Sequence, residues 1–231
     1  MPEKDSRTGL LEREQEIIKM LDLFLNKEFD FIVVGGYAIS TYKKRFSIDL
    51  DIVIKEEYLE RFEKVLKKEG YSLHYEKKIA LLYGENFKRF MKKIGGLPVD
   101  IDLLINGLVS RTTGAAWGFD YIKKYSVKRK IINSEFLTPE KELLIAMKFH
   151  SGRLSDIRDI VALMPCSKER LELHLSKGDI NKLKQSIKKQ VYFLEKPQFE
   201  DSFKGIFGPF LYNEKDVQAT KELINNLLKN K

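Results

Sequence analysis

The chain has 231 residues, of which 43% are apolar, so it is long enough to bury a sizeable core, and its composition argues against disorder. Lysine and arginine outnumber aspartate and glutamate by eight, a balance that favours polyanionic partners such as nucleotides or nucleic acid. No apolar run is long enough to cross a bilayer, the N-terminus lacks the apolar core of a signal peptide, and the single Cys166 excludes an internal disulfide. These features predict a cytoplasmic protein that does not enter a membrane.

Hydrophobic periodicity predicts an α/β (α+β) protein with a mixed sheet flanked by helices and a helical C-terminal part. In chain order the predicted elements are a helix at 10–25, a strand at 29–34, a short helix at 37–42, a strand at 48–54, a helix at 56–69, strands at 71–75, 79–83, 87–94 and 97–105, a weak helix at 114–121, a strand at 125–132, a helix starting at 138, and helices at 155–163, 170–175, 180–194 and 215–228. Thr138 is expected to cap its helix, with Pro139 in the first position. A boundary near Leu137 separates an α/β domain, 1–137, from a helical region, 138–231, that closes a cleft.

A pair of glycines, Gly35 and Gly36, follows the first predicted strand and precedes the short helix. Glycines at such a junction let the backbone turn tightly and approach a ligand closely. The free amides at the start of a helix then face an anion. We therefore expect this turn to bind phosphate.

Two acids interrupt the apolar strand predicted at 48–54. Asp49 and Asp51 are two residues apart and should project from one face, while Ile48, Leu50 and Ile52 pack against the other. Neighbouring carboxylates in an apolar strand repel each other and are costly to desolvate unless a cation or a donor satisfies them. A hard divalent metal, which prefers oxygen ligands, is the simplest solution, and it indicates phosphate chemistry.

The strand predicted at 97–105 carries a second pair of acids, Asp100 and Asp102, on one face. One of them, placed beside the first pair, would complete a site for two metals that could activate a hydroxyl and stabilise a departing pyrophosphate. Alternation does not separate the two candidates. Asp100, which is reached first after Pro98, is preferred as the metal ligand.

This arrangement resembles the nucleotidyltransferase signature of the polymerase β superfamily. The match consists of the diglycine, twelve intervening residues, the run Asp49-Leu50-Asp51 with Ser47 before it, and an acid on a later strand. A further segment, 148–160, is similar to a helical Lys…Arg-x-x-Asp-x-x-Asp segment of minimal nucleotidyltransferases. That group includes the toxin members of abortive-infection and toxin–antitoxin systems.

The resemblance implies a nucleotidyltransferase-like fold over roughly 28–165 and a metal-dependent enzyme that moves a nucleoside monophosphate from a nucleoside triphosphate, such as ATP, to an acceptor hydroxyl. The site residues it implies are Asp49 and Asp51 on Mg2+, Asp100 or Asp102 on a second ion and near the acceptor hydroxyl, Gly35, Gly36 and Ser47 at the phosphates, and Lys148 and Arg153 on the outer phosphates. The acceptor is an RNA 3′ end, a protein side chain or a small hydroxylated molecule. The basic charge favours a tRNA-like acceptor and a toxin-type role with an antitoxin-like protein partner.

Other interpretations of the same residues stay open. A diglycine is often only a turn, and Lys148, Arg153 and Asp156 would also suit a solvated helix face. The fold could serve as a catalytically inactive nucleotide-sensing or partner-binding domain. A metal-dependent glycosyltransferase also uses an Asp-x-Asp pair, although glycines thirteen residues before the first acid are not expected there.

Overall fold

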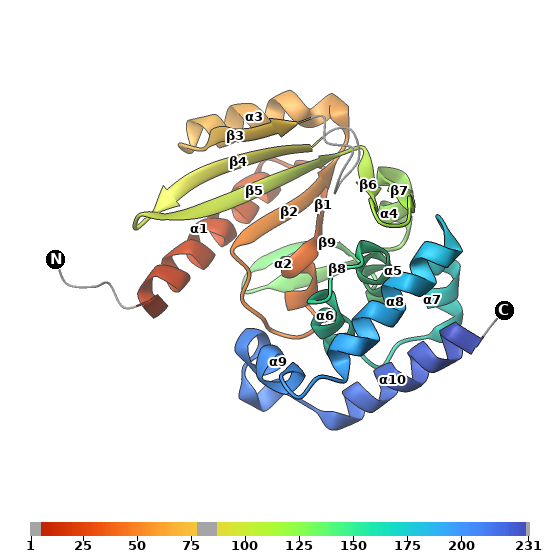
Figure 1. Ribbon diagram of the computed structural model, residues 1–231. Helices are drawn as coiled ribbons and strands as arrows, with labels where there is room; N and C mark the ends of the chain where they lie inside the picture. Colours follow the sequence, from red (N-terminus) through yellow and green to blue (C-terminus); the bar gives the residue numbers. More distant parts are fainter. Residues whose placement is uncertain (1–5, 78–86, 230–231) are drawn as a thin grey trace.

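The computed structural model describes residues 6–77 and 87–229 (Figure 1). Seven strands of this part form one mixed sheet in the order β3-β4-β5-β2-β1-β9-β8. Its strands are β1 Phe31–Val34, β2 Asp49–Ile54, β3 Ser72–Lys77, β4 Phe87–Ile94, β5 Leu97–Ile105, β8 Ser126–Ile131 and β9 Ser134–Pro139, and a separate pair is formed by β6 Gly107–Val109 and β7 Ala116–Gly118. Two neighbouring pairs, β2 with β5 and β1 with β9, run parallel, whereas the other neighbours are antiparallel. The mixed sheet predicted from the sequence is confirmed.

Helices cover both faces of the sheet. The helices are α1 Ser6–Asn26, α2 Gly35–Ser40, α3 Leu59–Lys68, α4 Phe119–Lys124, α5 Lys141–Ser151, α6 Asp156–Ala162, α7 Lys168–Leu175, α8 Ile180–Leu194, α9 Phe199–Phe207 and α10 Glu214–Lys229, with short 3-10 turns at Glu56–Tyr58 and Pro209–Leu211. The apolar stripe of α1 and the buried side of α3 pack on one face, against residues such as Leu50 and Ile101. Helices α4 and α5 pack on the other face, where Val53 and Leu104 belong to one buried cluster with Leu143 and Met147.

The C-terminal helices α6 to α10 gather around α5 in a third cluster of buried side chains (Figure 1). This helical part therefore lies over the same face of the sheet as α5. The division predicted at residue 137 stays a prediction, and strand β9 runs across that position. No helix in the described ranges is both long and apolar enough to span a membrane.

Several predicted elements differ from the structure. The helix predicted at 114–121 is wrong, because that stretch holds strand β7 and only the start of α4. The helix predicted after Thr138 is present as α5, but its predicted start and cap are wrong: Thr138 and Pro139 end strand β9, and α5 begins after Glu140. Pairing with β8 and β1 holds this segment extended. Helix α9 was not predicted, and the strand predicted at 79–83 lies outside the described residues.

Candidate functional site

Parallel pairing of β2 and β5 brings the four acids together. Asp49 lies beside Asp100 and Asp51 beside Asp102 in the register of the two strands. All four project from the face that α5 covers, since Leu50 and Ile52 between them are buried on the opposite side. The expectation that Ile48 packs there is wrong: it precedes the strand and is 46% exposed.

The diglycine lies directly against this acidic cluster. Gly35 has a φ of +64°, and a Cβ atom there would lie 1.9 Å from Oδ2 of Asp51. At Gly36 a Cβ would lie 2.2 Å from the hydroxyl oxygen of Ser47, which donates a hydrogen bond of 2.9 Å to Asp49. Glycine is therefore required at position 35 by both backbone conformation and space, and at position 36 by space. The two glycines form the first turn of α2 itself, rather than a loop before it.

The buried acids interact strongly with one another. Burial, followed by repulsion from Asp49 and Asp102, raises the pKa of Asp51 well above its ordinary value. The cations that oppose this shift, Lys148 and Arg153, act on Asp51 through space. Burial also raises the pKa of Asp102, although an ion pair opposes the effect. Ionising Asp51 and Asp102 on this face is therefore unfavourable, and a bound cation would lower the free energy of the charged form.

Arg89 of β4 supplies the ion pair on Asp102. Its Nε lies 2.8 Å from Oδ1 of Asp102 and its Nη2 lies 2.6 Å from Oδ2, a bidentate arrangement. Its Nη1 lies 3.8 Å from Oδ2 of Asp100. The other carboxylate oxygen of Asp100 is buried and has no hydrogen-bond partner in the described part of the chain.

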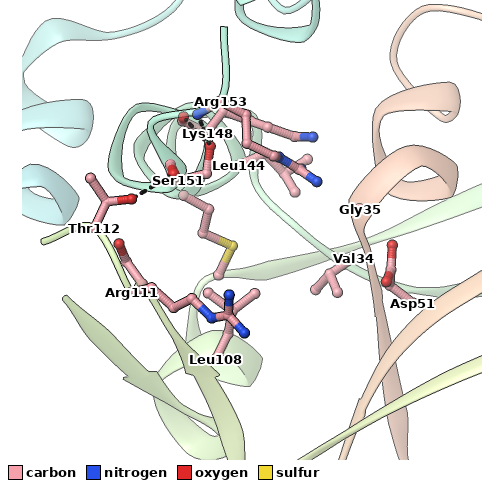
Figure 2. Close-up of a pocket in the computed structure, with 12 residues that line it drawn as sticks. Val34, Gly35, Asp51, Leu108, Arg111, Thr112, Leu144, Lys148, Ser151 and Arg153 are labelled. Atoms are coloured by element: carbon pink, nitrogen blue, oxygen red, sulfur yellow. Dashed lines mark hydrogen bonds between the residues drawn. The ribbon is translucent and has the colours of Figure 1, made fainter. Parts of the chain in front are cut away.

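Two cavities meet at the acidic cluster. The larger, of about 270 Å³, has an apolar wall of Val34, Leu108, Leu144 and Met147, with Arg111 at its side (Figure 2). The smaller, of about 150 Å³, is polar and is lined by the diglycine, Ser47, Asp49, Asp51, Arg45, Lys148, Arg153, Ser155, Asp156, Arg158 and Asp159. Four residues belong to both cavities: Gly35, Asp51, Lys148 and Arg153.

One face of α5 forms a wall of the larger cavity. Leu144, Met147, Lys148 and Ser151 follow the helical spacing of three and four residues and point to the same side. The opposite wall is the segment after β6, and it is tied to the end of α5 by hydrogen bonds. The hydroxyl of Ser110 donates to the carbonyl of His150. The hydroxyl of Thr112 donates to the carbonyl of Ser151 (Figure 2).

Cations and acids alternate in the polar cavity. Lys148 lies 3.0 Å from Asp156 and 2.7 Å from Asp159, and these acids outweigh burial to raise its pKa. Burial would raise the pKa of Asp156, but Lys148 and Arg153 lower it to about 2. Asp159 also pairs with Arg45, which precedes β2. The predicted Lys148, Arg153, Asp156 and Asp159 therefore form a network beside the acidic cluster, not a solvated helix face.

Solved structures of known proteins share this arrangement of elements. LnuA, a lincosamide antibiotic adenylyltransferase solved with lincomycin, has 18% sequence identity and a TM-score of 0.50, with 67% of this chain and 98% of LnuA covered. A candidate nucleotidyltransferase from H. pylori has 15% identity and a TM-score of 0.53, covering 98% and 96%. JHP933 from Helicobacter pylori has 14% identity and a TM-score of 0.54, covering 95% and 92%. The chain has the nucleotidyltransferase fold. No protein-family model and no curated protein sequence matches it.

The nucleotidyltransferase fold raises the question of whether the acids present fit a divalent metal. Asp49 and Asp51 offer hard oxygen donors, and a cation beside them would oppose the burial and the repulsion that raise the pKa of Asp51. Among the described residues, however, no group of three or more histidine, cysteine, aspartate or glutamate side chains is placed to hold a metal ion. The pair therefore suits a cation that takes further oxygen ligands from a bound phosphate.

Several residues of this site were missed in the sequence. Arg45, Arg111 and Arg158 line the cavities, but they lie in segments whose position depends on the whole sheet. Arg89 could have been found from the hairpin alone. The Gly95-Gly96 turn pairs residue 94 with residue 97, and counting back along both strands puts Arg89 opposite Asp102.

Proposed function

We propose that the protein is a metal-dependent nucleotidyltransferase that moves a nucleoside monophosphate from a nucleoside triphosphate to an acceptor hydroxyl. The observation that carries this proposal is the junction of an apolar cavity and a polar cavity at Gly35 and Asp51. A molecule that occupies both cavities has an apolar ring system at one end and a charged group at the other. A nucleoside triphosphate has this character.

The apolar cavity suits the nucleoside. Its volume of about 270 Å³ is close to the lower end of pockets that hold small molecules, roughly 300 Å³. Val34, Leu108 and Met147 offer apolar contact to a base, and the hydroxyls of Ser110 and Thr112 are already tied to backbone carbonyls. Base selectivity would then depend on Arg111 and on backbone groups of the wall.

The polar cavity suits the phosphates, provided that they bring cations with them. Among the described residues that line it, four cationic side chains are balanced by four acids. Its fixed charge is therefore close to zero, which is too little for a triphosphate. A divalent ion held by Asp49 and Asp51 would neutralise phosphate charge. Gly35 and Gly36 leave room for phosphate oxygens beside the acids, while Lys148 and Arg153 reach the same space.

Of the two β5 acids, Asp100 is the one assigned to assist the acceptor. One of its carboxylate oxygens is buried and unpartnered among the described residues, whereas Asp102 is occupied by Arg89. In the proposed step the acceptor hydroxyl gives its proton to Asp100, its oxygen forms a bond to the α-phosphorus, and the bond to pyrophosphate breaks. Positioning and charge neutralisation supply most of the remaining acceleration.

The acceptor is proposed only as a class, a hydroxyl group. LnuA is described as acting on lincosamide antibiotics, which supports small hydroxylated molecules. The excess of eight positive charges supports RNA, and a protein side chain is the third class. An antitoxin-like partner and a cytoplasmic setting remain predictions from the sequence.

A paired-label assay tests the proposal. The protein is incubated with Mg2+ and each of four nucleoside triphosphates, labelled at either the α- or the γ-phosphate, with RNA, protein and aminoglycoside-like acceptors in parallel. We expect the α-label, but not the γ-label, to enter an acceptor as pyrophosphate is released. Asp51→Asn should lower transfer at least about a hundredfold, whereas Asp201→Asn on the exposed side of α9 should not. Binding without pyrophosphate release would instead favour a nucleotide-sensing domain.

A further inference from the structure

The ion pair between Arg89 and the acidic cluster has a geometry that competes with metal binding. Asp102, only 1% exposed, faces the guanidinium with both carboxylate oxygens, at 2.8 and 2.6 Å. Both oxygens of Asp102 are therefore already engaged by a cation. Nη1 of the same guanidinium lies 3.8 Å from Oδ2 of Asp100, two residues before Asp102 on strand β5.

This pair is difficult to open. A guanidinium stays protonated at every physiological pH, and its planar fork matches a carboxylate better than a lysine does. Removing Asp102 from Arg89 would leave a buried carboxylate and a half-buried cation without their partners, which is strongly unfavourable. A divalent ion that used Asp102 as a ligand would have to displace Arg89 first.

Within residues 6–77 and 87–229, no cation forms such an ion pair with Asp49 or Asp51. Asp49 accepts a hydrogen bond from Ser47, and Asp51 lies beside Gly35 with Lys148 and Arg153 acting from a distance. The two pairs of acids on adjacent strands thus differ in their counter-charge. In the part of the chain that the structure describes, the β5 pair is in an ion pair with Arg89, whereas Lys148 and Arg153 act on the β2 pair without forming one.

We propose that Arg89 is a positioning residue that takes the place of a second metal ion. Its guanidinium holds Asp102 and partly balances Asp100, so the site binds one divalent cation, at Asp49 and Asp51. This inference rests on the proposed function and replaces the two-metal site expected from the sequence with one metal and one arginine. Asp100 keeps one carboxylate oxygen without a hydrogen-bond partner among the described residues.

Counting bound ions tests this directly. The folded protein, saturated with a non-hydrolysable triphosphate, is dialysed against Mn2+, and the ions held per chain are counted by electron paramagnetic resonance. We expect one Mn2+ for the wild type. Arg89→Gln frees Asp102 and should raise the count to two, while Arg89→Lys, which keeps the positive charge, should leave it at one. Lys93→Gln, which removes an exposed charge from the same strand, is the matched control.

Asp102→Asn supplies a second measurement if Arg89→Gln does not fold, as judged by circular dichroism. Because Asp102 is not a ligand in this account, the variant should still bind one Mn2+, with affinity changed less than about tenfold. Two ions in the wild type, or loss of the ion in Asp102→Asn, would overturn the inference and leave the proposed function intact. Failure of the wild type to bind any Mn2+ together with the triphosphate would overturn both.

Discussion

Asp51 is the residue in which stability and function oppose each other most clearly. It is 7% exposed, and two neighbouring acids add to the cost that burial places on its charge. Such a group destabilises the ligand-free protein, because its neighbours repel it and the interior solvates it poorly. The acid is retained at a point where a cation would relieve the cost, as expected for a functional group.

The first prediction follows from this opposition. In the presence of a chelator, Asp51→Asn should stabilise the protein by about 1 kcal/mol, which is roughly 2–4 °C in Tm for a chain of this length. The stabilisation that Mg2+ and a triphosphate give together should be lost in the same variant. Differential scanning calorimetry with and without ligands measures both effects, and Asp201→Asn serves as the control. A lower Tm for chelated Asp51→Asn would contradict this account of its charge.

A second prediction contrasts two glycines. Gly35→Ala should destabilise the fold by about 2–4 kcal/mol, because the residue has a positive φ and its new methyl group would clash with Asp51. Gly205→Ala in α9 should instead stabilise by about 0.5–1 kcal/mol, since nothing lies within 4 Å and the helix favours alanine. Urea unfolding of both variants gives the comparison. Equal effects would show that the space at Gly35 is not restrictive.

A third prediction concerns the pH dependence of stability. Burial lowers the pKa of His150 to about 4, so the folded protein keeps this ring neutral where the unfolded chain, with a pKa of 6.5, binds a proton. The contribution of His150 to stability should therefore fall as pH drops from 6.5 towards 4, by about 2 kcal/mol between pH 7 and pH 5. His150→Gln should remove most of this loss, while His74→Gln on the exposed edge strand β3 should not. Urea titrations at the two pH values measure the difference.

At the scale of elements, α5 connects the sheet to the site. One side of the helix packs on the sheet through Leu143, and the adjoining stripe that includes Leu144 and Lys148 lines the apolar cavity. The facing wall begins at β6, where Leu108 contributes its side chain to the same cavity. Because both walls are tied together at the end of α5, the cavity has a defined width.

A fourth prediction is that narrowing the apolar cavity between α5 and β6 weakens nucleotide binding. Leu108→Trp should fill part of the cavity and raise the KM for the nucleoside triphosphate roughly tenfold, with little change in kcat, because it obstructs binding without touching the acids. Leu173→Trp, on the exposed side of α7, is the matched control and should leave both parameters unchanged. Steady-state kinetics across triphosphate concentrations separates the two parameters. A large fall in kcat with an unchanged KM would place the nucleoside elsewhere.

The same scale shows what the sequence could and could not predict. Strand β2 and the hairpin of β4 and β5 were predictable because apolar alternation and the Gly95-Gly96 turn are local signals. Strand β9 was not, since Thr138-Pro139 has the pattern of a helix start and only pairing with β8 and β1 reveals a strand. The three residues of β7 are too few to show a period.

The candidate site divides in the same way. Acids that alternate within one strand show their common face in the sequence, so Asp49 and Asp51 were predictable as a pair. Their placement beside Asp100 and Asp102 depends on β5 being the parallel neighbour of β2, which is a property of the sheet order. The ion pair of Arg45 with Asp159 joins residues 114 positions apart, and no local pattern indicates it.

At the scale of the whole molecule, the site draws on both halves of the chain. The acids and the diglycine come from the sheet and α2, whereas Lys148 and Arg153 come from the end of α5 and the segment that follows it (Figure 1). The helical part also contributes Asp156 and Asp159, and the segment before β2 contributes Arg45. Each half supplies both kinds of charge, and only the complete fold brings Lys148 and Arg153 beside Asp51.

The central claim is that the diglycine and the β2 acids together bind a triphosphate and its cation, and crystallography tests it most directly. Crystals soaked with Mn2+ and a non-hydrolysable triphosphate would be measured at the manganese absorption edge. We predict an anomalous peak within coordination distance of Asp49 and Asp51, phosphates over Gly35 and Gly36, and the base between Leu108 and Met147. A triphosphate bound away from these acids, or a manganese peak elsewhere with none at Asp49 and Asp51, would contradict the account.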